Sequence, residues 1–314
     1  MQDVWDLLDS ETLLRTVEGI LAVKLANLIV PRNSYINRVF ELKSVDQEKF
    51  IVKFYRPDRW NKETILSEHH FLMALSAQEI PVIPPLIIQD NSIFEFGNIF
   101  FTIFPKIGGR AVDELDKEAW ALVGRLLART HTIGATLQGS QRAPWTPAYV
   151  TEMTTRLLLN SDLLPADFRK PFEQSTHLFL KIASPLLEKE PRSLIHGDCH
   201  LGNLLHRPGE GIFLVDFDDC CIGSPAQDLW MLLPGTPEEC LPEIEWFLEG
   251  YSVFRDFPLS SLKTIPFLRI MRRLHYAGWC AMQRHDLGFH SHFPEWGSPR
   301  YWNELIRDIQ STLY

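Results

Sequence analysis

Three polar residues placed around one apolar strand constrain this chain more than any other part of its sequence. The segment His196-Gly-Asp-Cys-His-Leu-Gly-Asn203 puts Asp198 five residues before Asn203 on one loop. An apolar run, Ile212–Val215, follows and ends at Asp216, thirteen residues after Asn203. A hairpin over this stretch returns the Asp216 carboxylate to the Asn203 amide, and such oxygen ligands suit Mg²⁺. The remaining carboxylate, Asp198, can orient a hydroxyl and accept its proton.

A lysine in the first third of the chain supplies the cation that a phosphate site needs. Lys53 lies in the apolar run Phe50–Tyr55, which we predict to be the second strand of a hairpin. Residues 61–78 carry apolar side chains at helical spacing and include Glu68, fifteen residues after Lys53. A carboxylate there can hold the lysine toward the phosphates of ATP. Glu63, about one turn earlier on the same helix, is the alternative partner.

The order of the predicted elements indicates an α+β fold with two lobes. Strands, the helix at 61–78 and a hairpin around Gly97-Asn98 form a small β-rich N-terminal lobe with one long helix. The turn-rich segment Pro105–Arg110 follows an apolar strand, and the chain beyond it is mainly helical. We therefore predict a nucleotide-binding lobe at 1–104, a hinge at 105–110, and a larger helical lobe at 111–314 for catalysis and substrate.

Composition and charge exclude several classes of partner. Forty acidic residues against 31 basic ones give a net charge of −9, which argues against a broad nucleic-acid surface. No stretch approaches the roughly 18 apolar residues of a membrane span, and the acidic start Met1–Ser10 is unlike a secretory signal. The five cysteines have no paired spacing, which favours reduced thiols. We expect a cytoplasmic monomer without a nucleic-acid or membrane partner.

The two polar motifs resemble the protein-kinase catalytic set, His-Arg-Asp-four residues-Asn followed by Asp-Phe-Gly. His-Gly-Asp-x-His-x-Gly-Asn and Asp216-Phe-Asp218 are similar, more specifically, to the aminoglycoside phosphotransferase and choline kinase branch of that fold. Within it, Asn33–Arg38, Val52–Pro57 and Gln227–Leu233 resemble a group of bacterial, cytoplasmic serine/threonine protein kinases of the stress response. The resemblance implies a bilobal protein-kinase-like fold.

The resemblance also assigns residues to roles, on top of the roles read from spacing alone. It implies Asp198 as the catalytic base, Asn203 and Asp216 as magnesium ligands, and a nucleotide contact at Ser34. Ser34 lies in a turn that lacks the Gly-x-Gly-x-x-Gly phosphate loop. The predicted site is thus catalytic at Asp198 and Asp216, nucleotide-binding at Ser34, Lys53 and Glu68, and metal-binding at Asn203 and Asp216, with ATP and Mg²⁺ bound.

The acceptor of the phosphoryl group is where the residues leave alternatives. Only seven residues separate Asp216 from a helix start at Ser224, and no Ala-Pro-Glu anchor follows, so a conventional activation loop is missing. That favours a small-molecule acceptor, or a protein held in another way. The segment Leu268–Tyr276 is basic, which suits an acidic peptide better than a polycationic aminoglycoside. We predict transfer to a protein Ser/Thr hydroxyl, including autophosphorylation. The alternatives are a small-molecule kinase of aminoglycoside, choline or homoserine type, and a nucleotide-binding pseudokinase scaffold.

Two further residues have two readings each. Asp228 falls in the first turn of the helix that starts at Ser224. It either compensates the helix dipole or braces the catalytic loop through hydrogen bonds. Cys199, inside that loop, is either a packed small thiol or a residue whose oxidation inhibits the enzyme.

Overall fold

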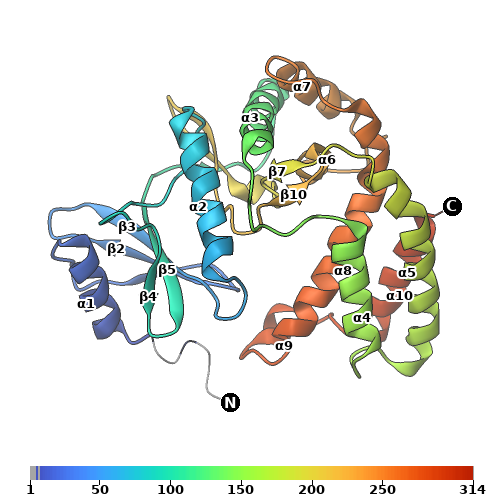
Figure 1. Ribbon diagram of the computed structural model, residues 1–314, viewed down its shortest axis with the longest axis horizontal. Helices are drawn as coiled ribbons and strands as arrows, with labels where there is room; N and C mark the ends of the chain where they lie inside the picture. The colour runs from blue at the N-terminus through green and yellow to red at the C-terminus, as the bar shows by residue number, and fades with distance from the viewer. Residues whose placement is uncertain (1–4, 6–7, 314) are drawn as a thin grey trace.

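The computed structural model describes residues 5 and 8–313, in which a sheet-rich N-terminal part lies beside a helical C-terminal part (Figure 1). Residues 1–4, 6, 7 and 314 fall outside the described residues, and most of the acidic start of the chain is among them. Across the described residues, no helix combines the length and apolarity that crossing a bilayer requires. The predicted α+β class is confirmed.

The N-terminal part is built on one antiparallel sheet with the strand order β1-β2-β3-β5-β4. Its strands are β1 (Val30–Arg32), β2 (Arg38–Lys43), β3 (Lys49–Phe54), β4 (Phe94–Phe96) and β5 (Ile99–Pro105). Both predicted hairpins are present: β2 pairs with β3, and β4 pairs with β5 across Gly97, whose φ of 61° favours glycine.

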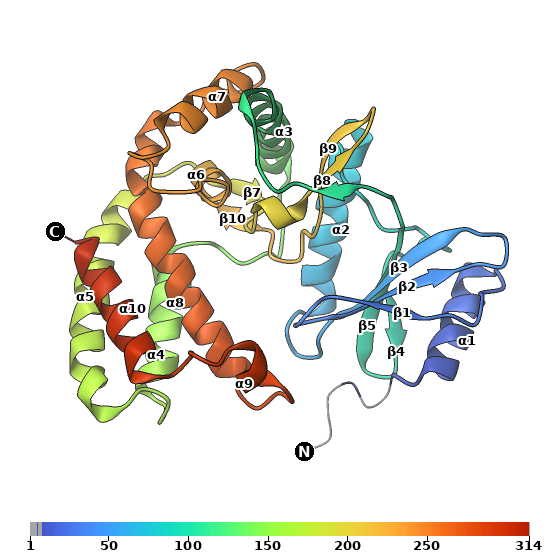
Figure 2. The same cartoon turned by 180° about the vertical axis from the view of Figure 1, so that it is seen from behind.

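Two helices flank this sheet. Helix α1 (Ser10–Leu21) covers one face, where Leu13 and Val17 share an apolar cluster with strand residues such as Val52. Helix α2 (Lys62–Ala77) coincides with the helix predicted at 61–78 and lies between the sheet and the C-terminal part (Figure 2). Before the first hairpin, α1 extends to Leu21 and the first strand begins at Val30.

The C-terminal part contains two small antiparallel sheets among helices. Strands β6 (Arg110–Ala111), β8 (Leu204–Arg207) and β9 (Gly211–Leu214) form one, and β7 (Ser193–Ile195) pairs with β10 (Cys221–Gly223) in the other. The helices are α3 (Lys117–Thr136), α4 (Met153–Leu159), α5 (Ala166–Leu187), α6 (Pro225–Trp230), α7 (Leu241–Tyr251), α8 (Ile265–Gln283), α9 (Phe289–His292) and α10 (Pro299–Ser311). Short helical segments of other types are a π-helix at Ala148–Glu152 and 3-10 helices at Leu201–Asn203 and Leu259–Thr264. Residues 106–109 connect β5 to β6 and so join the two parts.

Helices α3 and α7 pack closely against each other, and this packing sets the positions of His131 and Tyr251. Each helix presents a glycine at the crossing. A Cβ on Gly124 would lie 2.2 Å from the carbonyl oxygen of Phe247, and one on Gly250 would lie 1.9 Å from that of Ala121. Because neither position has room for a side chain, the helices approach closely enough for Tyr251 to reach His131.

Candidate active site

A cavity of about 690 Å³ lies between the sheet and the C-terminal part. It is lined by residues from the turn that contains Ser34, from strand β3, from helix α2 and from the catalytic loop, which is the segment His196–Asn203. Its walls include Ser34, Lys53, Glu68, Asp198 and Asp216. Five of the six predicted site residues therefore face one space. The sixth, Asn203, is buried on the same loop as Asp198 and donates to the Asp198 carbonyl, but it is not among the residues that line the cavity.

Backbone hydrogen bonds produce the predicted return of Asp216 to Asn203. Strands β8 and β9 form the expected hairpin, with Leu204 opposite Leu214. The Val215 N–H then donates to the Asn203 carbonyl at 3.0 Å, which sets Asp216 beside the loop. Asp216 itself has a φ of 60°, a strained backbone conformation for a non-glycine residue, and strain of this kind is concentrated at functional sites.

Asp228 braces the start of the catalytic loop. Its carboxylate is fully buried and accepts hydrogen bonds from the N–H groups of His196 at 2.9 Å and Gly197 at 2.7 Å. The Nε2 atom of His131 lies 2.9 Å from the same carboxylate, and Tyr251 contacts the other ring nitrogen at 3.0 Å. Of the two readings of Asp228, the structure supports the brace. Gly197 has a φ of 82°, and a Cβ there would lie 2.4 Å from the Asp219 carbonyl oxygen.

His196 ties the loop to the strand that carries Asp216. Its Nε2 lies 2.9 Å from the Val215 carbonyl, to which it can only donate, so Nδ1 is the acceptor for the Asp198 N–H at 3.3 Å. One imidazole thus fixes the backbone next to both predicted catalytic aspartates.

Lys53 is surrounded by carboxylates, and Glu68 is its partner on α2. The Nζ atom lies 3.7 Å from Glu68, 3.5 Å from Asp216 and 2.9 Å from Asp218. Glu63, the alternative partner, is exposed in the first turn of α2. Burial alone lowers the pKa of the lysine, but Asp218 and Glu68 outweigh burial and raise that pKa well above its usual value. Lys53 is therefore a permanent cation beside the cavity.

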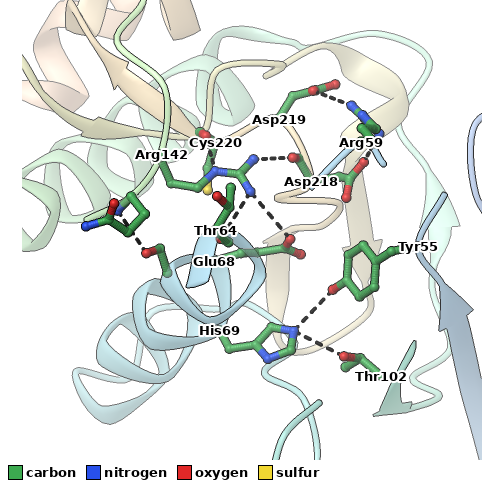
Figure 3. Close-up of polar contacts among 12 residues, drawn as sticks. Tyr55, Arg59, Thr64, Glu68, His69, Thr102, Arg142, Asp218, Asp219 and Cys220 are labelled. Atoms are coloured by element: carbon green, nitrogen blue, oxygen red, sulfur yellow. Dashed lines mark hydrogen bonds and ion pairs between the residues drawn. The ribbon is translucent and has the colours of Figure 1, made fainter. Parts of the chain in front are cut away.

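Two arginines that the sequence reading missed complete this charge cluster (Figure 3). Arg59 binds Asp218 and, at 2.6 Å, Asp219. Arg142, which is 3% exposed, donates to the carbonyls of Cys220 at 2.6 Å and of Asp218, and lies 4.0 Å from Glu68. Burial raises the pKa of Asp218, but Arg59 and Lys53 outweigh it and keep that pKa below its usual range.

The residues predicted to hold a metal fit that task chemically. The Asn203 side-chain N–H₂ donates to the Asp198 carbonyl at 2.9 Å, and its amide oxygen accepts no hydrogen bond from the described residues. The Asp216 carboxylate is 59% exposed and contacts only Lys53 among the described cations. Among the described residues there is no group of three His, Cys, Asp or Glu side chains that could hold a metal alone. Two oxygen donors suit Mg²⁺ that takes its remaining ligands from phosphates and water.

The turn that contains Ser34 is held against both parts of the molecule. Asn37 donates to the Asp218 carboxylate at 3.2 Å and accepts from the Arg56 N–H at 3.2 Å. The Tyr35 ring packs against Trp279 and Phe293 at centroid distances of 5.6 and 4.9 Å. Ser34 thus reaches the cavity from a turn that side-chain contacts hold in place.

The basic segment of α8 contributes one residue to the site. Arg272 lies 2.5 Å from Oδ1 of Asp198. Its neighbours are used elsewhere, because Arg269 donates to the Gly235 carbonyl at 3.0 Å and Arg273 pairs with Asp308 on α10. The expected basic face of this helix is therefore mostly engaged in contacts within the C-terminal part.

Cys199 is a packed residue in this structure. Its side chain is fully buried, and burial raises the pKa of the thiol well above its usual value, with the Asp228 charge adding to the effect. The reactive thiolate is disfavoured there. The reading of Cys199 as a small core residue is the one that the structure supports, and all five cysteines are free and buried.

Comparison with known proteins finds relatives that match most of this chain. The model of the phosphotransferase enzyme family matches residues 28–261. The chain is 33% identical over 276 residues to stress response kinase A of Escherichia coli K12, which covers 87% of this chain and 83% of that protein. It is 32% identical, with the same coverage, to the serine/threonine protein kinase RdoA of Salmonella typhimurium. The solved structure of amicoumacin kinase hAmiN with AMP-PNP and Ca²⁺ shares the fold, at a TM-score of 0.77 and 19% identity, over 99% of this chain and 95% of that one.

Proposed function

This chain belongs to the phosphotransferase enzyme family, and we propose that it is a Mg²⁺- and ATP-dependent serine/threonine protein kinase of a bacterial stress response. The observation that carries the phosphoryl-transfer part is the single cavity that Ser34, Lys53, Asp198 and Asp216 share. Phosphoryl transfer needs little covalent chemistry from a protein, but it needs the nucleophile, the phosphates and the metal in fixed positions. These residues are of the types that each position requires.

The proposed reaction moves one proton and one phosphoryl group. The Asp198 carboxylate accepts the proton of the acceptor hydroxyl as its oxygen attacks the γ-phosphorus. The bond from that phosphorus to the β-phosphate oxygen breaks, and ADP leaves with the electron pair. Lys53 neutralises the phosphates, and the Ser34 hydroxyl donates to them. Bound at Asn203 and Asp216, Mg²⁺ would supply charge neutralisation between the phosphates.

The choice of a protein acceptor is supported by the names of the relatives at 32–33% identity. Only residues 217–223 separate Asp216 from Ser224, the N-cap of α6, and the last three of them form β10, so the described residues contain no activation loop of the conventional kind. A protein substrate must therefore bind by other contacts. We further propose 105–110 as the hinge between lobes at 1–104 and 111–314, and a monomer that acts in the cytoplasm.

Labelled ATP distinguishes this proposal from its alternatives. With Mg²⁺ and γ-labelled ATP, the purified protein should label itself or a generic protein, and the label should be recovered as phosphoserine or phosphothreonine. Asp198→Ala should abolish labelling, whereas Arg273→Gln, altered at the far pair with Asp308, should not. Labelling of choline, homoserine or an aminoglycoside alone would replace the protein kinase by a small-molecule kinase. A thermal shift with ATP and Mg²⁺ but no turnover on any acceptor would identify a pseudokinase.

A further inference from the structure

Both carboxylate oxygens of the predicted base, Asp198, lie near nitrogen atoms of other side chains of the protein. Oδ1 lies 2.5 Å from a guanidinium nitrogen of Arg272, and Oδ2 lies 3.6 Å from Nε2 of His200. A general base must come within about 2.6–3.2 Å of the hydroxyl from which it takes a proton. As long as Arg272 occupies Oδ1, that oxygen has little room for an acceptor hydroxyl.

Arg272 is free to exchange this partner. Its side chain is 26% exposed, and among the described residues Asp198 is its only hydrogen-bond or ion-pair partner. A guanidinium has five N–H donors, so most of those donors remain available. The other carboxylate that interacts electrostatically with it, Asp219, is bound at 2.6 Å by Arg59. An anion that arrives with the acceptor therefore meets a cation held by a single carboxylate.

We propose that Arg272 selects acceptors that carry an acidic group beside the phosphorylated hydroxyl. The acidic group takes the place of Asp198 on the guanidinium, and Oδ1 is released to accept the hydroxyl proton. Either the carboxylate of an adjacent Asp or Glu or the phosphate of an already phosphorylated residue provides this chemistry, since both bind a guanidinium fork. A cationic acceptor is repelled at the same point. The inference rests on the proposed function, because it names the class of protein substrate for that site.

The same exchange restrains wasteful hydrolysis. Water carries no acidic group, so it leaves Arg272 on Asp198 and finds Oδ1 occupied. Hydrolysis requires the same proton balance as transfer: Asp198 takes a proton from water, the oxygen bonds to the γ-phosphorus, and ADP leaves with the electron pair. Removal of the Arg272 guanidinium should therefore expose the base to water as well as remove acceptor selection. A purely structural arginine would produce neither effect.

Peptide kinetics test the selection. Serine peptides of one length, which differ only in Glu, phosphoserine, Gln or Lys beside the acceptor, are compared by kcat/KM. Wild type should prefer the Glu or phosphoserine peptide over the Gln peptide by about tenfold, the typical worth of a charge-assisted hydrogen bond. The difference between Glu and phosphoserine identifies the preferred anion. Arg272→Gln should reduce the preference to below about twofold, and Arg272→Lys, which keeps the charge without the fork, should retain part of it.

Acceptor-free ATP hydrolysis provides the second readout. Arg272→Gln should hydrolyse ATP several-fold faster than wild type, and Arg272→Lys should lie between the two. The matched control is Arg273→Gln, one residue along α8, whose partner is Asp308 on α10. It should match wild type in both measurements. Equal thermal unfolding of the variants shows that folding is not the cause.

Two results would overturn the inference. One is an acidic-peptide preference that Arg272→Gln leaves intact, or a wild type that prefers neutral or Lys peptides. The other is unchanged hydrolysis in a folded Arg272→Gln protein. If wild type labels neither itself, nor a generic protein, nor any peptide, the proposed protein kinase function fails by itself. The hydrolysis measurement then decides alone whether Arg272 covers the base.

Discussion

The Nζ atom of Lys53 lies 2.9 Å from Oδ1 of Asp218, nearer than the 3.7 Å that separates it from Glu68. Asp218 is the last residue of Asp-Phe-Asp, at the position where protein kinases have glycine. It is buried and is also bound by Arg59 and Asn37. The second aspartate of this motif therefore anchors the lysine, which leaves the first, Asp216, exposed for a metal.

This anchoring predicts that Asp218→Asn is strongly destabilising. The change removes the negative charge of Asp218, with which two buried cations, Lys53 and Arg59, both pair. Removal of one partner from a buried ion pair costs about 3–5 kcal/mol. Urea unfolding should show this loss, and the KM for ATP should rise because the lysine is no longer held. Glu63→Gln, on the exposed first turn of α2, should change the free energy of unfolding by less than about 0.5 kcal/mol. An Asp218→Asn protein as stable as this control would contradict the anchor.

Glu68 predicts how activity depends on pH. Burial raises its pKa from 4.5 to about 7, and the Lys53 charge offsets only part of that effect. Because the raised pKa favours the protonated acid, Glu68 adds stability that is complete below about pH 4.5 and is lost as pH rises through about 7. Activity has the opposite sign, since only the ionised carboxylate pairs with Lys53. The kcat/KM for ATP should fall as pH drops below about 7 and lose this dependence in Glu68→Gln. If kcat/KM for ATP still falls at acidic pH in Glu68→Gln, another group causes that fall.

Replacement of one carboxylate oxygen of the buried Asp228 should slow turnover. Asp228→Asn keeps the side-chain volume. One of the two oxygens that accept from the His196 and Gly197 N–H groups is replaced by an N–H₂ group, which can only donate. Each buried donor left unpaired costs about 1–3 kcal/mol. The loop that carries Asp198 then loses its fixed position, so kcat should fall at least about tenfold with a smaller change in the KM for ATP. Asp308→Asn, which alters a partly exposed pair with Arg273, is the comparison. Equal kcat in both variants would remove Asp228 from the mechanism.

Local spacing explains what could be predicted from this sequence. The β8–β9 hairpin and α2 depend on residues close together in the chain, and the predicted helix at 61–78 differs from α2 by one residue at each end. Helix α1 was overlooked, although Asp9 caps it by accepting from the Thr12 N–H and Leu13 and Val17 mark its apolar face. That capping pattern was the available signal.

The missed arginines have no such local signal. Arg142 reaches the Cys220 carbonyl across 78 positions of sequence, and Arg59 reaches Asp219 across 160. Their charges match many acids in the chain equally well, so only the packing of whole elements selects the partner. The same reason left Lys53 with one predicted carboxylate partner where the fold provides three.

The ion pair of Arg56 with Asp286 should act as a latch between the two parts of the molecule. Arg56 follows β3, Asp286 follows α8, and the two side chains are joined by paired hydrogen bonds of 2.7 and 2.6 Å. Tyr35 donates to the same carboxylate at 3.4 Å, beside the turn that lines the cavity. Arg56→Gln and Asp286→Asn should each raise the KM for ATP a few-fold, because the Ser34 turn loses its support.

A double-mutant cycle separates this latch from ordinary surface charge. Bidentate geometry and partial burial should give Arg56 and Asp286 a coupling of about 1–3 kcal/mol in unfolding free energy, within the range found for residues in contact. The exposed pair Arg300–Glu304 on α10, at 2.9 Å, is the matched cycle and should give about 0.5 kcal/mol or less. Charge exchange in Arg56→Asp/Asp286→Arg should restore part of the ATP affinity that either single change removes. Equal coupling in the two cycles would mean that Arg56 and Asp286 stabilise the contact between the two parts no more than an exposed surface pair does.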